Sequence, residues 1–526
     1  MAKGYDFIVA GGGSAGSVVA ARLSEDPNIQ VLLLEAGGSD RHPFYHLPAG
    51  FAKMTKGIGS WGWETVPQKN MQNKVFRYTQ AKVMGGGSAI NAQIYTRGNA
   101  QDYDDWRQMG CTGWGYEDVL PYFRKAEDND TFENEYHRKG GPLGVSQPIA
   151  PLPVCEAYFE AAAALGIPRN FDVNGAKQDG ACYYQLNQRN ARRSSAAMAY
   201  IRPNRNRANL TIQTGAQVRR LIVERDRVTG VELIDGTRVT AANEVVLSSG
   251  AVGSPRLLQL SGIGPADHLS SLGIDVVFDQ PQVGENLQDH LDLYCISELS
   301  GPYSYDRYGK PLWAILAGLQ YLFQRKGPVA SSLFETGGFW YADEHARSPD
   351  LQLHLGLGTG IEHGVAHMPQ GGVTLNSCYL RPRSRGTIRL QSADPAKAPL
   401  IDPNYLSDPL DREMSIRGLR LTQDILSQAP LSKFIMAERL PGPDVKTDAD
   451  YFDFICQHSK TSHHCAGTCR MGPDDQAVVD TKLRFNGLDG LRIVDNSIMP
   501  TVISSNTNAA AIMIGEKAAD MIKATR

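Results

Sequence analysis

The chain has 526 residues, more than one ordinary hydrophobic core accommodates, so we expect at least two domains. Hydrophobic residues make up 42% and charged residues 21% of it, which is typical of a globular protein in water, and no apolar run is long enough to cross a bilayer. The formal net charge of −3 gives no indication of a nucleic-acid partner.

The cysteines favour a reducing compartment. Eight of them are scattered along the chain without a C-x-x-C pair, as expected of free thiols. The first apolar segment begins at residue 5, which leaves no room for a signal peptide ahead of it, so we expect a cytoplasmic protein. His463, His464, Cys465 and Cys469 are metal-ligand residue types, but their spacing matches no zinc pattern, and we predict no metal site.

The first motif in the chain is a glycine-rich turn. Residues 7–10 predict a buried parallel strand, and Gly11, Gly13 and Gly16 behind it fit G-x-G-x-x-G. Residues 17–23 predict a helix of small residues packed close to that strand. Such a turn brings the backbone close to a pyrophosphate, which then faces the free N–H groups of the helix N-terminus.

A second apolar run completes this βαβ unit. Residues 31–34 predict another strand, and it ends in Glu35, about twenty residues after the glycines. An acid at this place binds a ribose hydroxyl. The sequence therefore predicts an α/β fold with a Rossmann-like, dinucleotide-binding domain at the N-terminus.

The same turn permits a second interpretation. Gly12, Ser14 and Gly16 also match G-x-S-x-G, the nucleophile elbow of α/β-hydrolases, in which Ser14 would be the nucleophile. That elbow needs several strands before it to build its sheet, and only one precedes this turn. We therefore favour the dinucleotide site, which flavin absorbance of the purified protein would distinguish from a hydrolase.

A second glycine-rich turn follows a long loop. Residues 37–80 are mostly loop, and Gly85, Gly86 and Gly87 then precede a helix start at Ser88. Here too the backbone would approach a ligand closely. One turn would hold an ADP moiety and the other the rest of an extended cofactor, and FAD is long enough to need both.

The middle of the chain changes in character. Residues 102–147 predict a helix with loops, and residues 155–165 an Ala-rich helix. Short strand patterns follow at residues 210–213, 218–223, 228–234 and 244–247, and a helix at 253–260. Further alternating patterns at residues 350–354, 373–380 and 387–390 predict an antiparallel sheet.

Two helices close the list of elements. Residues 311–324 predict an unusually apolar helix, too short to span a membrane, which we expect to be buried in a substrate-binding domain. Contact with a membrane surface is the alternative. After a strand at 491–494 that ends at Asp495, residues 509–522 predict the last helix, with Asn508 as its N-cap.

Four separated motifs together resemble those of the glucose-methanol-choline (GMC) oxidoreductases over essentially the whole chain. They are residues 81–104, with Met84 where Leu, Ile, Val or Trp is usual, residues 250–264, residues 283–290, and His464 ahead of Gly467 and Thr468 together with Asn508. The resemblance implies a discontinuous FAD-binding domain at 1–155, 206–295 and 456–526. It also implies a substrate-binding domain at 156–205 and 296–455, with a six-stranded antiparallel sheet over the flavin.

The resemblance also implies how FAD is held. The FAD would be non-covalent, because Ile90 stands where some members have the His that carries it. Val218 would approach the adenine, and Asp495 the ribityl or pyrophosphate region. The residues implied to contact FAD are Gly11, Gly13, Ser14, Ala15, Gly16, Glu35, Ala36, Trp61, Gly85, Gly86, Ser88, Asn91, Ala92, Val218, Asp495 and Asn508.

The implied activity is the oxidation of an alcohol. His464 would remove the hydroxyl proton, since an alkoxide gives up hydride far more readily, and Asn508 would hydrogen-bond the same oxygen. The helix after Asn508 would stabilise negative charge on the reduced flavin.

Within the family, the likeness to L-sorbose dehydrogenases rests on residues 50–55, 327–331, 339–341 and 380–387. We therefore expect an alcohol or sugar substrate, with L-sorbose to L-sorbosone as the leading case and a quinone-like electron acceptor. An oxidase that uses oxygen, and a non-redox lyase with a structural flavin, stay open as alternatives.

Overall fold

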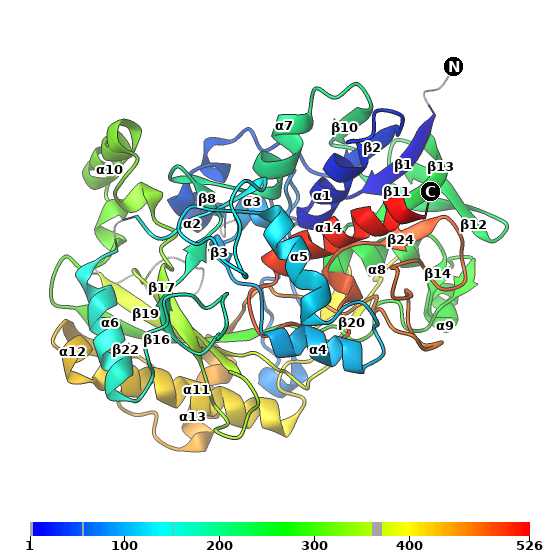
Figure 1. Cartoon of the computed structure of the whole chain (residues 1–526). Coiled ribbons are helices and arrows are strands. Elements are labelled where there is room, and N and C mark those ends of the chain that lie inside the picture. Colours follow the sequence, from blue (N-terminus) through cyan, green and yellow to red (C-terminus); the bar gives the residue numbers. More distant parts are fainter. Residues whose placement is uncertain (1–3, 55–56, 150, 360–370, 526) are drawn as a thin grey trace.

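The computed structural model describes residues 4–54, 57–149, 151–359 and 371–525. Two seven-stranded sheets organise these residues (Figure 1). The first sheet contains the predicted βαβ unit: β1 (Tyr5–Ala10) and β2 (Val31–Glu35) pair in parallel, and α1 (Ser14–Leu23) connects them. Every residue of β2 is buried, as expected of a parallel strand covered on both faces.

The first sheet draws its strands from distant parts of the chain. β10 (Leu210–Thr214) pairs in parallel with β2, while β13 (Arg238–Leu247) pairs in parallel with both β1 and β24 (Leu491–Ile493). The first half of β13 instead pairs antiparallel with β12 (Arg227–Leu233), which continues to β11 (Val218–Glu224). The predicted α/β class is therefore confirmed.

The second sheet is antiparallel, as predicted. Its strands lie in the order β22 (Ile435–Leu440), β16 (Leu291–Leu299), β19 (Gly372–Tyr379), β18 (Leu351–Gly356), β17 (Thr336–Trp340) and β6 (Gly180–Tyr183). The two-residue strand β23 (Lys460–Thr461) adds a seventh by pairing with the start of β16. The predicted domain boundaries stay a prediction.

Helices cover both sheets. α14 (Asn508–Ala524) packs beside α1, the pair seen in red and blue in Figure 1. The second sheet shares its core with α6 (Pro153–Ala164), α11 (Pro409–Ser427), α12 (Ala429–Ser432) and α13 (Asp448–His458). The other helices of four or more residues are α2 (Phe51–Met54), α3 (Gly87–Ile90), α4 (Ala100–Gln108), α5 (Tyr116–Ala126), α8 (Gly250–Leu260), α9 (Ala266–Ser271) and α10 (Pro311–Gln324).

Short elements complete the fold. They are α7 (Arg202–Asn204), the π-helical turn η4 (Ala197–Ile201), the 3-10 turns η1 (Pro43–Tyr45), η2 (Pro48–Gly50), η3 (Lys69–Met71), η5 (Asp306–Gly309), η6 (Pro328–Ala330) and η7 (Asn496–Ile498), and the strands β3 (Ile94–Tyr95), β4 (Glu127–Asn129), β5 (Leu143–Val145), β7 (Gln185–Leu186), β8 (Gln188–Arg189), β9 (Arg192–Arg193), β14 (Ile263–Gly264), β15 (Phe278–Asp279), β20 (Thr387–Arg389) and β21 (Leu400–Asp402).

Two helix predictions were wrong in detail. The last helix begins at Asn508 rather than after it, and the N-cap is Thr507, because the Asn508 side chain bonds elsewhere. The apolar helix α10 is not buried: only Ala317 and Tyr321 face the protein body, and its outer side is exposed. Within the described residues, no helix is both long and apolar enough to span a membrane.

Candidate active site

A cavity of about 370 Å³ is lined by residues of both sheets. Ala10 and Leu34 at the carboxyl ends of β1 and β2 border it, as do His354 of β18 and Asn376 of β19. Ligands of open α/β sheets bind at the carboxyl ends of the strands. The predicted contact residues that line this cavity are Gly11, Gly13, Ser14, Ala15, Glu35, Ala36, Trp61, Gly86, Asn91, Ala92, Val218, Asp495 and Asn508.

The two glycine-rich turns lie against each other. The Gly85 N–H donates to the Gly12 carbonyl at 2.7 Å, and a Cβ on Gly86 would stand 2.6 Å from the Gly13 Cα. Gly87, by contrast, lines the cavity, and a Cβ on it would meet nothing within 4 Å. Bare backbone of both turns therefore borders one continuous space, as an extended anionic cofactor requires.

Glu35 is held by the turn that it follows. Its Oε2 accepts from the Gly12 N–H at 3.0 Å and its Oε1 from the Gly37 N–H at 2.7 Å. Burial raises the pKa of this carboxyl above its ordinary value. Each oxygen keeps a second lone pair, so Glu35 can still accept a hydrogen bond from a hydroxyl in the cavity.

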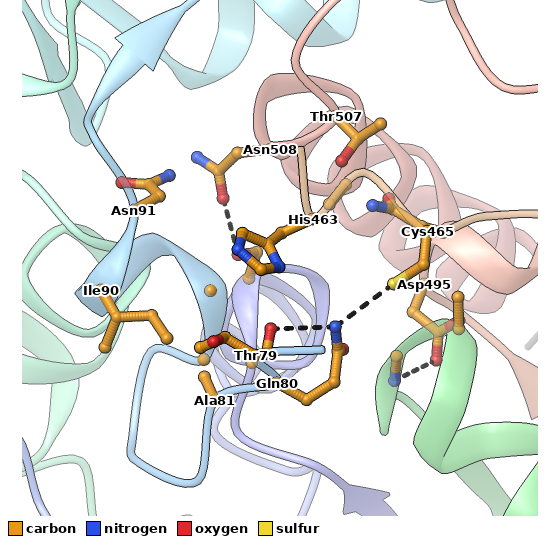
Figure 2. A pocket seen from close by; sticks show the side chains of 18 of the residues that line it. Thr79, Gln80, Ala81, Ile90, Asn91, His463, Cys465, Asp495, Thr507 and Asn508 are labelled. Carbon is orange, nitrogen blue, oxygen red and sulfur yellow. Dashed lines mark hydrogen bonds between the residues drawn. The ribbon is translucent and has the colours of Figure 1, made fainter. Parts of the chain in front are cut away.

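Asp495 follows β24 at the same carboxyl-end edge of the first sheet as Glu35. Its Oδ2 accepts from the Gly250 N–H at 2.9 Å and the Ser254 hydroxyl at 2.6 Å, which fixes the start of α8 (Figure 2). The Ser497 N–H donates to its Oδ1 at 2.8 Å. This carboxyl thus holds two backbone segments at the cavity wall.

Three predicted contact residues do not line the cavity. A Cβ on Gly16 would stand 1.9 Å from the Gly11 carbonyl, so Gly16 permits close packing of the first turn. Gly85 faces Ala197 instead. The Ser88 hydroxyl donates to the Gly85 carbonyl at 2.5 Å, which stabilises the second turn. These three residues shape the turns without bordering the space.

His464 lies in the cavity wall with both ring nitrogens engaged. Its Nδ1 is 2.9 Å from Nδ1 of His290, and its Nε2 is 3.0 Å from Nδ2 of Asn506. The His464 N–H donates to Asp289 Oδ1 at 2.7 Å, which fixes the backbone. Burial lowers the pKa of His464 well below its ordinary value, and nearby histidines lower it further, so the ring is neutral at pH 7.

The hydrogen bonds determine which nitrogen of His464 carries the proton. His290 Nε2 is 3.0 Å from the carbonyl of Leu380, which can only accept, so that nitrogen is protonated. Burial lowers the pKa of His290 to about 4, and its Nδ1 is then an acceptor. His464 therefore donates from Nδ1 to His290, and its Nε2 carries no proton and is a hydrogen-bond acceptor.

Asn506 supports the same assignment. Its Oδ1 accepts from Gln352 Nε2 at 2.9 Å and from the Thr96 hydroxyl at 3.1 Å, so its Nδ2 must be the group that faces His464. A donor at 3.0 Å is what an unprotonated Nε2 requires.

Asn508 forms hydrogen bonds with residues other than His464. Its Oδ1 accepts from the Ser14 hydroxyl at 2.8 Å, and its Nδ2 donates to Asn187 at 3.3 Å. Ser14 thus contacts an amide rather than a histidine, which leaves the hydrolase interpretation without a base. Asn506 and Asn508 both line the cavity, so the role predicted for Asn508 stays a prediction. Sequence reasoning gave no role to Asn506 or to His290, although it noted the motif that contains His290.

His463 lies beside His464 in sequence but points elsewhere. Its φ of 60° is a left-handed conformation, uncommon outside glycine, and it lets the two adjacent rings face different surroundings. Figure 2 shows its ring projecting into the pocket between Asn508 and Gln80. The ring of His463 is exposed to the cavity, but the protein encloses the cavity itself. The loss of bulk water around the ring lowers the pKa of His463 to about 4.

The second sheet gives the cavity a polar wall. Asp292 Oδ2 accepts from Lys460 Nζ at 2.8 Å and from Asn376 Nδ2 at 2.9 Å. Within the described residues, Asp292 Oδ1, Asn376 Oδ1 and His354 Nε2 are buried without a hydrogen-bond partner. All three residues line the cavity, so its wall contains polar groups whose hydrogen bonds the protein does not supply.

One group of metal-ligand type comes together among the described residues. Asp292, His354 and Cys378 place ligand atoms within 4.8 Å of one another. The Lys460 ammonium beside Asp292 already supplies a positive charge, and burial raises the pKa of the Cys378 thiol well above its ordinary value. Both features disfavour a cation there.

The fold and the cavity define a flavoprotein of the dinucleotide-binding class, and two family profiles described as GMC oxidoreductase match residues 5–292 and 382–515. The chain belongs to the GMC oxidoreductases, and its cofactor is FAD. Glycine backbone for the pyrophosphate, Glu35 for a ribose and the space between the two turns fit this group.

Named relatives agree with this family. An alcohol dehydrogenase (acceptor) of Pseudomonas putida is 40% identical over 98% of this chain and 95% of its own length. An oxygen-dependent choline dehydrogenase of Escherichia coli is 41% identical over 99% and 95%. Among solved structures, a pyridoxine 4-oxidase from Mesorbium loti is 34% identical, with a TM-score of 0.90 and 99% of both chains covered.

Proposed function

We propose that this chain oxidises the primary hydroxyl of a small polyhydroxylated alcohol or sugar to an aldehyde, with L-sorbose to L-sorbosone as the leading case. The observation that carries the proposal is the unprotonated Nε2 of His464, which lies in the wall of a cavity that three residues with unsatisfied polar atoms also line. Bound FAD supplies the acceptor for the hydride; the chain's own residues bind, orient and deprotonate the alcohol.

His464 is the proposed base. Its Nε2 accepts the hydroxyl proton, and His290 stabilises the ring by accepting from Nδ1–H. The substrate hydroxyl would replace Asn506 as the donor to Nε2, and the amide N–H that Asn506 then has free can donate to the substrate oxygen. We therefore assign the positioning role to Asn506 in place of Asn508. Asn508 stays a proposed contact of the cofactor.

The polar wall favours a substrate with several hydroxyl groups. A buried polar atom without a partner costs about 1–3 kcal/mol, so hydroxyls that satisfy Asp292 Oδ1 and Asn376 Oδ1 would be bound selectively. A quaternary ammonium is less suited to this wall, because Lys460 neutralises Asp292. We therefore propose a substrate other than the choline that appears in the names of some relatives.

The proposed electron acceptor is quinone-like. An oxidase that uses oxygen is the second candidate, and it is favoured by the likeness to a protein named pyridoxine 4-oxidase. The exposed apolar helix α10 supports the first candidate, because contact with a membrane surface would bring the enzyme close to a lipid-soluble quinone.

Anaerobic mixing with L-sorbose, 1-octanol, benzyl alcohol and choline tests the substrate. We expect kcat/KM for L-sorbose to exceed that for each other alcohol by tenfold or more, about 1.4 kcal/mol in transition-state binding. A kcat/KM for one of the other alcohols that is tenfold higher than that for L-sorbose would overturn the sugar assignment. Admitting air afterwards separates the acceptors: slow recolouring of the flavin supports a quinone, and rapid recolouring an oxidase.

Asn376→Leu provides the matched variant for this panel. It removes an amide of the polar wall at nearly constant volume, so kcat/KM for L-sorbose should fall about tenfold while that for 1-octanol changes little. Equal losses of kcat/KM for both alcohols would show that Asn376 shapes the cavity but does not hydrogen-bond the substrate.

A further inference from the structure

The outer face of α10 is a continuous apolar stripe. Its side chains are more than two-fifths exposed, up to 65% for Leu312 and 84% for Phe323. They recur at helical spacing and therefore point to one side. The stripe consists of Leu312, Ile315, Leu316, Leu319, Leu322 and Phe323.

The opposite face fixes the helix to the protein. Ala317 and Tyr321 are buried, and the Tyr321 hydroxyl donates to the Ala191 carbonyl at 2.9 Å. Tyr321 also packs in a small core with Ala191 and Ala330. The apolar stripe is thus held outward, and Figure 1 shows α10 at the periphery of the molecule.

The charged residues that directly flank α10 in the sequence are positive. Lys310 precedes the helix, and Arg325 and Lys326 follow it; all three side chains are exposed. No acidic residue occurs between Asp306 and Glu335, although the whole chain carries a net charge of −3. Basic side chains at the ends of an apolar helix reach the headgroups when the apolar face enters a lipid layer.

The helix dimensions decide between spanning and lying on a membrane. Fourteen residues give a length of about 21 Å, well below the roughly 30 Å of a bilayer core. Trp313, which is 40% exposed, lies near the N-terminal end of the helix, where an aromatic ring suits the interface.

We infer that α10 docks the enzyme on an anionic lipid surface, with its axis in the plane of the interface. Lipid suits this face better than a second copy of the chain, because antiparallel packing of two such helices would bring Lys310 against Arg325 and Lys326. The inference depends on neither the substrate nor the acceptor proposed above.

The docked helix lies close to the cavity wall. α10 packs on η6, η6 packs on η2, and Phe51, the residue after η2, lines the cavity. These contacts connect the docked helix to the wall of the cavity that a lipid-soluble acceptor would have to reach; this step alone rests on the proposed function.

Vesicle sedimentation tests the docking. The FAD-loaded enzyme is mixed with vesicles of phosphatidylcholine and phosphatidylglycerol in a 3:1 ratio, and with phosphatidylcholine alone. We expect binding to the anionic vesicles, weakened at least tenfold by the triple substitution Ile315→Gln, Leu319→Gln and Phe323→Gln. Lys310→Gln with Lys326→Gln should weaken binding to anionic vesicles and reduce its salt dependence, since Arg325 remains.

Phe171→Gln is the matched control, since Phe171 is 72% exposed but lies outside α10. Phe171→Gln should bind vesicles like the parent. Phe171→Gln and the triple variant should both keep the parent rate with a water-soluble dye as acceptor. Three results would overturn the inference: no binding by the parent, equal binding by the triple variant, or a triple variant whose only change is from dimer to monomer.

Discussion

The ring nitrogens of His464 carry the proposed chemistry, and their protonation follows from a chain of hydrogen bonds. The Leu380 carbonyl fixes the proton of His290 on Nε2, and His290 in turn fixes the proton of His464 on Nδ1. A base whose lone pair is oriented in this way needs no tautomer exchange before it accepts a proton. His290 is therefore a positioning residue.

Replacing His290 by Leu should slow flavin reduction by the alcohol about 10- to 100-fold. The buried Nδ1–H of His464 would lose its acceptor, which costs about 1–3 kcal/mol and frees the ring to adopt the wrong tautomer. Anaerobic stopped-flow absorbance measures the rate. His290→Gln, whose amide oxygen can accept from Nδ1–H, should recover part of it.

The pH profile distinguishes positioning from a loss of structure. Because burial lowers the pKa of His464, the proton-accepting form persists as the pH falls, and the parent rate should be flat from roughly pH 6 to pH 8. His290→Leu should give the same flat profile at a lower level, with unchanged FAD content. If the His290→Leu enzyme reduced its flavin as fast as the parent, His290 would have no positioning role.

Ile90 leads us to expect a flavin that is not covalently bound. It lines the cavity and has no nucleophilic atom, so we expect acid precipitation of the enzyme to release all the flavin into the supernatant. Absorbance of the supernatant and of the washed pellet measures the two fractions. Yellow colour that stays in the pellet would reveal a covalent bond to another residue.

Close packing of α1 and α14 holds the first glycine-rich turn in place. A Cβ on Gly515 of α14 would stand 2.8 Å from the Ala15 carbonyl and 2.9 Å from the Val18 Cβ. At the start of α14, Asn508 bonds to Ser14 at the start of α1. The two helices therefore position the turn and the asparagine loop together.

Gly515→Ala should lower the stability of the FAD-loaded enzyme by about 1–3 kcal/mol, because backbone must move to admit the methyl group. Gly318→Ala is the matched control, since that Cβ would meet nothing within 4 Å in α10. It should stabilise the protein by about 0.5–1 kcal/mol through helix propensity. Thermal unfolding measures both, and equal Tm values for the two variants would contradict this packing.

At the scale of elements, local patterns predicted most of what the structure contains. The turn of Gly11, Gly13 and Gly16 was recognisable because strand, turn and helix are adjacent in sequence. The exposure of α10 was not, since an all-round apolar composition is also typical of a buried helix. The contact between Asn506 and His464 depends on the path of an irregular loop, for which sequence periodicity gives no information.

The whole molecule brings together residues that no local pattern connects. β16 pairs with β23 so that Asp292 faces Lys460, and the same pairing brings His290 next to His464. These partners lie more than 160 residues apart, so their contact depends on the closure of the second sheet. The cofactor half of the site could therefore be predicted from sequence, whereas the polar wall and the histidine pair could not.

The central claim is that His464 takes the hydroxyl proton, and anaerobic flavin reduction by the preferred alcohol tests it most directly. His464→Ala should bind FAD yet be reduced about 10²- to 10⁴-fold more slowly than the parent, while the neighbouring His463→Ala stays within about tenfold. A His464→Ala enzyme reduced within about threefold of the parent rate would contradict the claim.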